Sequence, residues 1–229
     1  MKHLFTISLL FPLLLSAQCY GSFEAFAAAG FSNTPSTFSS QSATFRPTDV
    51  YRFGFGASFG LGKRVHLRIG VQFSQYGEEA SFPGLRWGTQ HDGDGGFDPD
   101  APSGEPFFQQ RSRHNYIEGL LALRYELSKR RRLRPFLEGG FTLGVYGLTT
   151  TEDLTGGTSS SERISTLRSL APIARFGVGV NYRLNKHLGL FAMPVGQLHL
   201  QSINTSGVAL TRSWQVALEV GMRVFVDPR

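Results

Sequence analysis

The sequence lacks the residues on which most catalytic and cofactor sites depend. Cys19 is the only cysteine, which excludes an intramolecular disulfide and a thiol redox motif. The six histidines form no pair at metal-ligand spacing, and no Ser–His pair falls on one outward face of the predicted strands. Gly54, Gly56 and Gly60 precede no helix pattern, so they do not form a dinucleotide-binding fingerprint. The sequence therefore predicts no catalytic residue, no cofactor and no metal site, and we expect a protein that is not an enzyme.

Long apolar runs are missing after the N-terminus. Residues 4–15 are almost wholly apolar, follow a basic start at Lys2 and precede small residues, which is typical of a secretory signal peptide. The run is too short to span a bilayer as a helix, which disfavours a retained anchor. We assign residues 1–21 to the signal peptide and 22–229 to one mature domain, with cleavage after Ala17 or after Gly21. Lipidation at Cys19 is a third option, although Gln18 fits poorly the small residue that lipoprotein processing prefers.

Basic and acidic residues stand in different connections between the predicted strands, and the short connections have few acidic residues. The net charge is +6, but the basic residues 63–64, 129–132 and Lys186 stand in the shortest connections, while the longest connections carry the acids. A protein that binds a nucleic-acid duplex presents one basic stripe on a recognisable module, and neither is present. We therefore expect no nucleic-acid partner.

Side-chain type alternates residue by residue from Tyr51 to Tyr76, with a break at residues 62–64. Strand side chains switch faces at every residue, so this pattern predicts two strands with one apolar face and one polar or small face. Each strand has roughly ten residues, the length that a tilted strand needs to cross a bilayer. The same pattern recurs along the chain. The predicted strands are 23–30, 51–61, 65–76, 113–127, 134–147, 171–184, 187–200 and 212–225. Alanines blur the alternation of the first strand, and the seventh is ambiguous in face and contains Pro194, which predicts a bulge or local break in the ladder.

Connection lengths alternate between long and short. The segments 32–49, 77–112, 148–170 and 202–210 are long, polar and predicted to be loops, whereas the other links are tight turns. Unpaired backbone in lipid costs several kcal/mol per group, so the sheet has to close. The fold class predicted is all-β, a closed antiparallel transmembrane β-barrel with eight up-and-down strands, monomeric in outer-membrane lipids. Long outer loops and short inner turns place both termini in the periplasm.

Tyrosines stand near the ends of the predicted strands, and Trp214 begins the last strand. Amphipathic rings favour the membrane interface, which predicts two aromatic girdles. The tyrosines assigned to them are Tyr51, Tyr76, Tyr116, Tyr125, Tyr146 and Tyr182, with an inward position as the alternative for Tyr116, which shares its face with Glu118.

Charged residues on the inward faces are the candidate site. An eight-stranded barrel is just wide enough to be filled by its own side chains, and buried charges need partners. We interpret them as an arginine–glutamate network that closes the lumen, with an arginine-lined ion-selective pore as the alternative. The set comprises Arg52, Arg68, Arg124, Arg175, Arg183 and Arg223 with Glu118, Glu126, Glu138 and Glu219.

The segment from Asp92 to Asp100 alternates aspartate with glycine, as calcium loops do. It lacks the acidic ligands that an EF-hand places at its fifth and twelfth positions. A flexible acidic loop is the simpler interpretation, and weak calcium binding is the alternative.

Two neighbouring strands carry a family-like pattern. The segments YIEGLLALRY (116–125) and RPFLEGGFTLG (134–144), joined by a short basic turn, resemble the small PorT-like outer-membrane β-barrel family typical of Bacteroidota. Gly119 and Leu120 stand where members of that family commonly have Ile-Pro, which is a departure from the pattern. The resemblance implies an outer-membrane barrel, and it implies for some relatives a role in protein secretion or gliding; it brings no catalytic residues.

The functional prediction is a barrel with a filled lumen that has a structural or surface-interaction role through long extracellular loops. The alternatives are a small ion or solute pore, an accessory component of a secretion or gliding machinery, and a lipid-modifying enzyme. The expected partners are outer-membrane lipids and either an extracellular ligand or secretion-machinery proteins.

Overall fold

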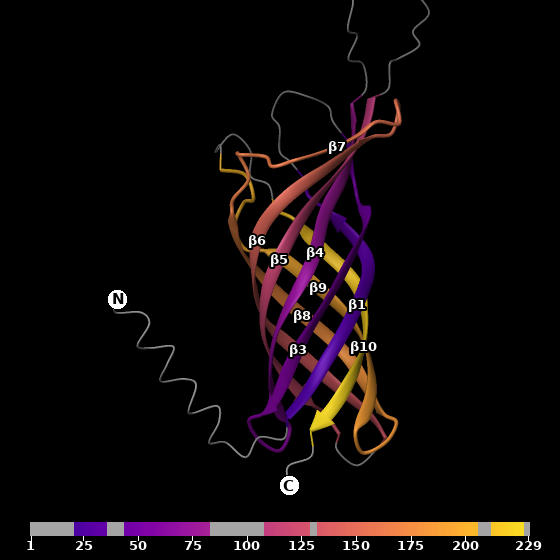
Figure 1. Cartoon of the computed structure of the whole chain (residues 1–229), viewed down its shortest axis with the longest axis vertical. Coiled ribbons are helices and arrows are strands. Elements are labelled where there is room, and N and C mark those ends of the chain that lie inside the picture. The colour runs from indigo at the N-terminus through magenta and orange to yellow at the C-terminus, as the bar shows by residue number, and fades with distance from the viewer. Residues whose placement is uncertain (1–20, 36–43, 83–107, 129–131, 206–211, 227–229) are drawn as a thin grey trace, which may run out of the picture.

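A computed structural model describes residues 21–35, 44–82, 108–128, 132–205 and 212–226. Eight long strands form the wall of a barrel, and two short strands extend it (Figure 1). The long strands are β1 Gly21–Asn33, β3 Thr48–Gly60, β4 Val65–Phe82, β5 Phe108–Glu126, β6 Leu133–Asp153, β8 Leu170–Arg183, β9 Leu188–His199 and β10 Trp214–Val226. The short strands are β2 Thr44–Arg46, which pairs with β4, and β7 Ser159–Glu162, which pairs with β6.

Antiparallel pairing closes the sheet. Each long strand pairs with the next long strand along the chain, and β10 pairs with β1 from Gly21–Val226 to Asn33–Trp214. No wall strand therefore has a free edge along this ladder. Lipid offers no hydrogen-bond partners to backbone N–H and C=O groups, so a sheet that spans a membrane has to close in this way. The predicted closed, eight-stranded, up-and-down antiparallel barrel is confirmed.

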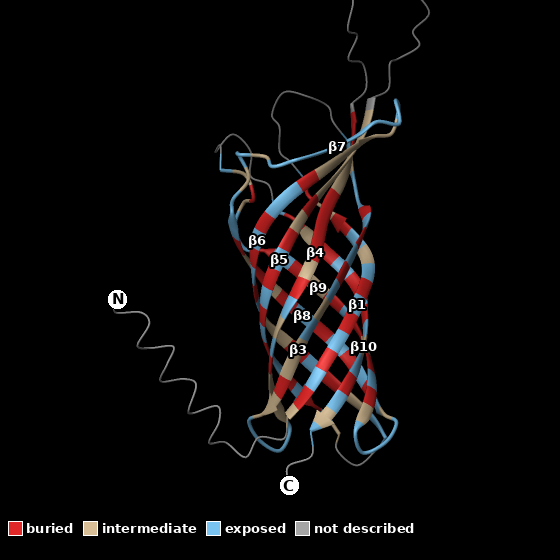
Figure 2. Ribbon diagram, in the orientation of Figure 1, coloured by how far each residue is buried: buried red, intermediate tan, exposed pale blue. Residues whose placement is uncertain are grey.

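Burial alternates along the wall strands up to the outer parts of β4, β5 and β6, as Figure 2 shows by its banded ribbons. On the outward face, Phe55 is 69% exposed and Leu218 is 53% exposed, whereas inward-facing Arg68 and Glu219 are fully buried. The outward faces predicted from alternation are confirmed. An apolar surface this large and continuous has no counterpart on ordinary soluble monomers.

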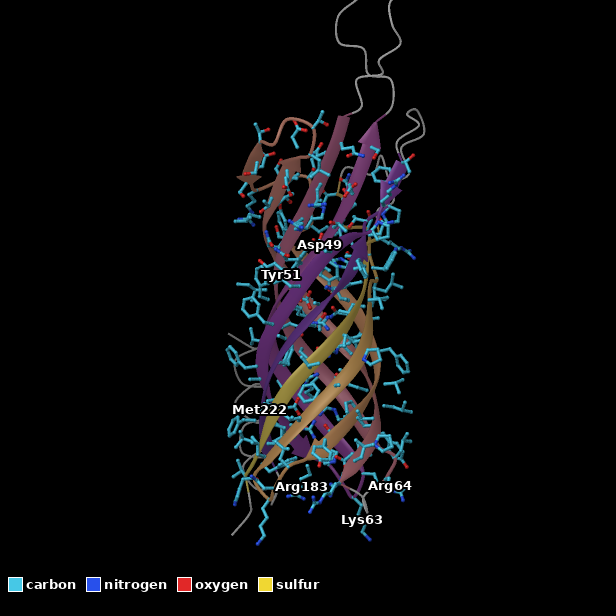
Figure 3. All side chains as sticks on the ribbon, turned by 90° about the vertical axis from the view of Figure 1, so that its right-hand side faces the viewer. Asp49, Tyr51, Lys63, Arg64, Arg183 and Met222 are labelled. Carbon is cyan, nitrogen blue, oxygen red and sulfur yellow. The ribbon has the colours of Figure 1, made fainter. Side chains whose placement is uncertain are left out.

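The two ends of the barrel differ. The connections 61–64, 127–132 and 184–187 are short and lie at the end where β1 begins and β10 ends, which we call the turn rim (Figure 1). Lys63, Arg64 and Arg183 lie together at this rim, while Asp49 and Tyr51 lie toward the opposite end, the loop rim (Figure 3). The alternation of short and long connections is confirmed.

Five strands are longer than predicted: β1 and β3 by a few residues, which with β2 also shortens the loop predicted for 32–49, and β4, β5 and β6 by more. β4 continues to Phe82 and β5 begins at Phe108, so the interpretation of 77–112 as wholly irregular is wrong at both ends. β6 continues to Asp153 and turns back into β7, which also corrects the loop predicted for 148–170. We call the outer parts of β4, β5 and β6, together with β2 and β7, the projection. Polar residues stand on both faces of these strands, and the few apolar ones, such as Phe45 and Ala80, form no alternation that a sequence pattern could detect.

The aromatic-girdle prediction is half wrong. Tyr51, Tyr125 and Tyr182 are 52%, 42% and 41% exposed on the outer surface, and Tyr51 stacks with Phe53 and Phe73. By contrast, three of the predicted girdle residues lie inside the lumen and are at most 2% exposed. These residues are Tyr76, Tyr116 and Tyr146. Each has the same parity as the inward residues of its strand, so alternation outweighs position near a strand end.

Proline interrupts the ladder where it was expected to. Pro194 in β9 pairs with Leu218 of β10 on one side, but the β8–β9 register passes from Gly177–Val195 to Val180–Ala192 without intervening pairs. The predicted local break is confirmed, since proline has no N–H for the ladder. The inward face of β9, left ambiguous by its sequence, carries Phe191, Met193, Val195, Gln197 and His199.

Two predictions fall outside the described residues: the signal peptide over 1–21 except for Gly21, with Cys19, and the acidic segment from Asp92 to Asp100. The described chain enters β1 at Gly21. No helix of sufficient length and hydropathy to cross a membrane is present in the described ranges.

Candidate functional site in the barrel lumen

A cluster of buried charges occupies the middle of the lumen, and we call it the central cluster. None of its members is more than 3% exposed. It consists of Glu24, Glu138, Glu219, Arg52, Arg68, Arg124, Arg175 and Arg223. These side chains come from β1, β3, β4, β5, β6, β8 and β10, and Gln197 of β9 binds Arg52, so all eight wall strands meet here.

Arg68 is the hub of the central cluster because it contacts all three glutamates. Its Nε lies 2.9 Å from Oε2 of Glu24, and its Nη1 lies 2.9 Å from Oε1 of Glu138 and 3.0 Å from Oε1 of Glu219. Charge-assisted contacts at this distance are the strongest class of protein hydrogen bond. Arg68 thereby ties β4 to β1, β6 and β10 across the lumen.

Each glutamate in turn binds several arginines. Glu138 accepts from Nε of Arg124 at 2.9 Å and from Nε of Arg175 at 3.1 Å. Glu219 accepts from Nη2 of Arg52 at 3.0 Å and from Nη2 of Arg175 at 2.8 Å.

The third glutamate, Glu24, is bound from two further strands. It accepts from Nη1 of Arg124 at 3.0 Å and lies 2.7 Å from Nη2 of Arg223. Because every carboxylate in the cluster has more than one guanidinium partner, none is left as a free base for proton transfer.

Small residues in register make room for the long side chains. Arg52 faces Ala28, Arg68 faces Ser58 and Ala122, and Arg175 faces Gly140. Strand partners lie only about 5 Å apart, so two long inward side chains side by side on every pair would overfill an eight-stranded lumen.

Phenylalanine rings flank the guanidinium groups. The Arg68 guanidinium lies 4.6 Å from the Phe26 ring centroid, and that of Arg124 lies 4.3 Å from Phe136. Phe191 lies beside both arginines, at 5.5 and 5.4 Å. A Cβ on Gly221 would come within 2.5 Å of the Phe191 ring, so glycine is needed there for the ring to fit. Stacking on rings gives the charges a partially apolar shell without leaving them unpaired.

A second polar layer lies on the loop-rim side of the central cluster. Glu118 accepts from Nε2 of Gln72 at 2.6 Å and from the Tyr76 hydroxyl at 2.9 Å. The Arg52 Nη1 donates to Oε1 of Gln215 at 3.1 Å and also to Gln197, which links the two layers.

Aromatic side chains fill the next level. Tyr76 packs edge-on against Tyr116 and His199, with ring centroids 5.6 and 4.5 Å apart. The Tyr146 hydroxyl lies 2.7 Å from Oγ1 of Thr149 and accepts from the Ile164 N–H of the loop between β7 and β8. These hydrogen bonds connect the loop between β7 and β8 to the side chains that fill the lumen.

The structure separates the predicted lumen charges into three groups. Arg52, Arg68, Arg124, Arg175, Arg223, Glu138 and Glu219 lie in the central cluster, and Glu118 lies in the layer next to it. Glu126 lies at the turn rim, 3.6 Å from Nη1 of Arg134. Arg183 also lies at the turn rim, where it lines the mouth of the lumen with Glu126 and donates to the backbone oxygens of Asn185 and Lys186 rather than to a glutamate.

Several lumen residues escaped the sequence analysis. Glu24 was missed because alanines blur the alternation of β1, and Gln197 because β9 was ambiguous in face. Each stands an even number of residues from the buried residues of its own strand. Because side chains alternate between faces, this spacing is the signal that could have identified them. Among the described residues no group of three or more histidine, cysteine or acidic side chains is placed to hold a metal ion.

Several solved structures of outer membrane proteins are similar to this chain at low sequence identity. A major outer membrane protein from Thermus thermophilus is 16% identical, over 90% of this chain and 99% of its own, with a TM-score of 0.48. Neisserial surface protein A is 17% identical, over 88% and 96%, with a TM-score of 0.43. The outer membrane protease OmpT from Escherichia coli is 8% identical, over 92% and 98%, with a TM-score of 0.47. Similarity at this level assigns no activity or ligand to this chain.

Among curated proteins none matches this chain. At the level of families, residues 16–227 match the outer membrane protein beta-barrel domain, which spans all the described strands. The chain therefore belongs to this outer-membrane β-barrel family.

Proposed function

We propose that this chain is a non-conducting outer-membrane barrel that acts at the outer surface through its projection and long loops. The observation that carries this proposal is the filling of the lumen. At the level of the central cluster, five arginines and three glutamates occupy the interior with exposures of 3% or less.

An ion crossing this level would have to separate pairs held at 2.7–3.1 Å in a region without access to water. Removing one partner from such a pair leaves an uncompensated buried charge, which is strongly unfavourable. The aromatic level at Tyr76, Tyr116 and Tyr146 adds a second obstruction. Both levels support a closed barrel over the alternative of a small ion or solute pore.

The projection supports a role at the surface. Outward apolar residues of β6 end at Leu148, and the strand then continues as Thr149–Asp153 beyond the apolar band. β7 is exposed throughout and pairs with this extension. Strands that continue past the lipid provide a preformed scaffold, and loops on rigid scaffolds are where binding residues concentrate.

The orientation that this role requires places the loop rim outside the cell and the turn rim, with both termini, in the periplasm. Short turns on the periplasmic side and long loops outside are the rule for bacterial outer-membrane barrels. Single cysteines at Ser160 in β7 and at Gly62 in a turn test it with a membrane-impermeant maleimide on whole cells. We expect labelling of the cysteine at position 160 and protection at position 62; the reverse pattern would contradict the orientation.

Planar-bilayer recording tests closure of the lumen. We expect no stable unitary openings from the purified protein at either polarity, under conditions in which a general porin added as a control conducts. Stable openings would favour the pore instead.

The wall needs no second copy, since each long strand has partners on both sides, and we propose a monomer embedded in outer-membrane lipids. We propose no catalytic role, because the buried carboxylates are occupied by arginines.

An accessory role in a secretion or gliding machinery is the second candidate, and the basic turn rim favours it. Lys63, Arg64 and Arg183 lie on that side of the barrel (Figure 3). Cross-linking from the cysteine at position 62 distinguishes the two. Capture of one defined periplasmic partner there would support the machinery role, and cross-links only from position 160 would support the surface role.

A further inference from the structure

The lumen is open where it reaches the turn rim. A cavity of about 550 Å³ lies there, walled by residues of β1, β3, β4, β5, β6, β8 and β10 and by the turn between β3 and β4. We call it the turn-rim cavity. Its charged and titratable lining side chains are Lys63, His66, Glu126, Arg134, Arg183 and Arg223.

Positive charge is in excess in this cavity. Four lining side chains are cationic and one, Glu126, is a carboxylate. Its contacts are long, at 3.6 Å from Nη1 of Arg134 and 3.8 Å from Nε2 of His66. In the central cluster the corresponding contacts measure 2.7–3.1 Å. Among the described lining residues Glu126 is the one carboxylate, and of the lining arginines Arg223 alone has a described carboxylate contact as short as those in the central cluster, to Glu24 at 2.7 Å.

Two buried donors at this cavity have no acceptor within the described chain. Arg223, 3% exposed, pairs through Nη2 with Glu24, but its Nε has no hydrogen-bond partner. Asn181, 7% exposed, lies in a side recess that shares Glu126, Arg134, Arg183, Arg223 and Phe225 with the cavity, and its Nδ2 is unpartnered. Both atoms are covered by protein, so an acceptor oxygen in the cavity reaches them only when these side chains turn toward it. Unmet buried donors cost free energy, which favours such a turn when an acceptor is present.

An aromatic ring orients the guanidinium groups. The Arg183 guanidinium lies 4.8 Å from the Phe225 ring centroid, and that of Arg223 lies 5.8 Å from the same ring. Arg183 is held further by its donation to the backbone oxygens of Asn185 and Lys186, at 3.2 and 2.9 Å. A guanidinium fixed in this way loses little entropy on binding a planar or tetrahedral oxyanion.

We propose that the turn-rim cavity binds a small oxyanion, the carboxylate or phosphate group of a solute in the compartment that this rim faces. Lys63, Arg183 and Arg223 line the cavity and supply the charge, and Asn181 lies in the side recess next to them. The cavity lies inside the ring of strands, so its ligand comes from water and not from the lipid around the outer wall. This binding is independent of what the loop rim contacts.

Titration of the isotope-labelled protein in neutral detergent micelles tests the site. Inorganic phosphate and citrate are added separately, and nuclear magnetic resonance follows the Asn181 side-chain amide and the Gly21 and Gly60 backbone amides. Saturable shifts at these groups with either anion support the site, and the anion that produces them identifies phosphate or carboxylate as the preferred chemistry. If neither anion gives saturable shifts there, the proposal is wrong.

A matched pair of variants separates a built site from general charge. Arg183→Gln removes a lining guanidinium, and we expect the dissociation constant to rise by about tenfold, as for one lost charge-assisted hydrogen bond. Arg64→Gln removes the same charge from the same rim, but Arg64 does not line the cavity and instead donates to Tyr125. We expect its dissociation constant to change by less than about twofold.

Equal weakening in both variants would show that only the net charge of the rim matters and would overturn the proposed site. Arg183 lies outside the central cluster, so the barrel is expected to fold without it. Should Arg183→Gln fail to fold, Lys63→Gln in the turn provides the same comparison, with the same two outcomes.

Discussion

Arginine–carboxylate pairs join strands at two levels of this barrel, and the two levels differ in their access to water. In the central cluster, the pairing side chains of Arg68, Glu138 and Glu219 are fully buried, with contacts of 2.9 and 3.0 Å. In the projection, Arg111 lies 3.3 Å from Glu79 and 3.4 Å from Glu152, with side chains 20–41% exposed.

The same chemistry has different consequences at the two levels. A buried pair is expensive to form, because both charges leave water, and more expensive to break from one side. An exposed pair gains little, because water and salt screen it. The central cluster therefore fixes which strands meet in the lumen, whereas the ladder in the projection adds only modest support to strands already paired through their backbones.

Glu219→Gln is expected to have the largest effect. It leaves Arg52, Arg68 and Arg175 without one of their carboxylates, and we expect a loss of about 3–5 kcal/mol in the free energy of unfolding. Urea titration in micelles, followed by the mobility of unheated samples on gels, measures it. A loss below about 1 kcal/mol would mean that water reaches the cluster.

Leu218→Arg moves an arginine to the other face of the same strand. Leu218 is 53% exposed on the outer wall, and arginine at the bilayer midplane costs about 2–4 kcal/mol. The same urea titration in lipid vesicles measures this cost, with Leu218→Val as the control for lost volume. A neutral result would show that this position lies outside the hydrocarbon.

Glu79→Gln repeats the first substitution in the projection. It removes one partner of Arg111 where water remains accessible, and we expect a change of about 0.2–1 kcal/mol. Measurement at low and high salt sharpens the comparison, because the exposed pair should weaken with salt and the buried cluster should not. Equal losses for Glu79→Gln and Glu219→Gln would remove the distinction between the two levels.

Deletion of residues 84–106 is expected to have the smallest effect. Phe82 and Phe108 are register partners, so a short turn of glycine and asparagine can join β4 to β5. Since even a doubling of loop length costs only about 0.6 kcal/mol, we expect the stability to stay within about 1 kcal/mol. Loss of the heat-dependent gel shift would indicate that the deleted segment takes part in folding. A deletion that begins at Glu79 would also remove residues of β4 that pair with β5, so it would not test the loop alone.

Alternation alone placed most residues on the correct face. It located the outward residues on β3, β4, β5, β6, β8 and β10, and it placed seven members of the central cluster in the lumen. It failed at β1 and β9, where alanine, glycine and proline weaken the contrast between faces. It also failed in the projection, where no lipid or packed core selects apolar side chains.

The sequence by itself determined the period of the strands, the order of short and long connections, and the need for closure in a membrane. Only the tertiary structure decided which charges meet. Arg52 and Glu219 are 167 residues apart and stand on strands separated by β1, and Arg124 and Glu24 are 100 residues apart. Contacts across a lumen depend on strand tilt and stagger, which the registers of all eight strands set together and no single strand encodes.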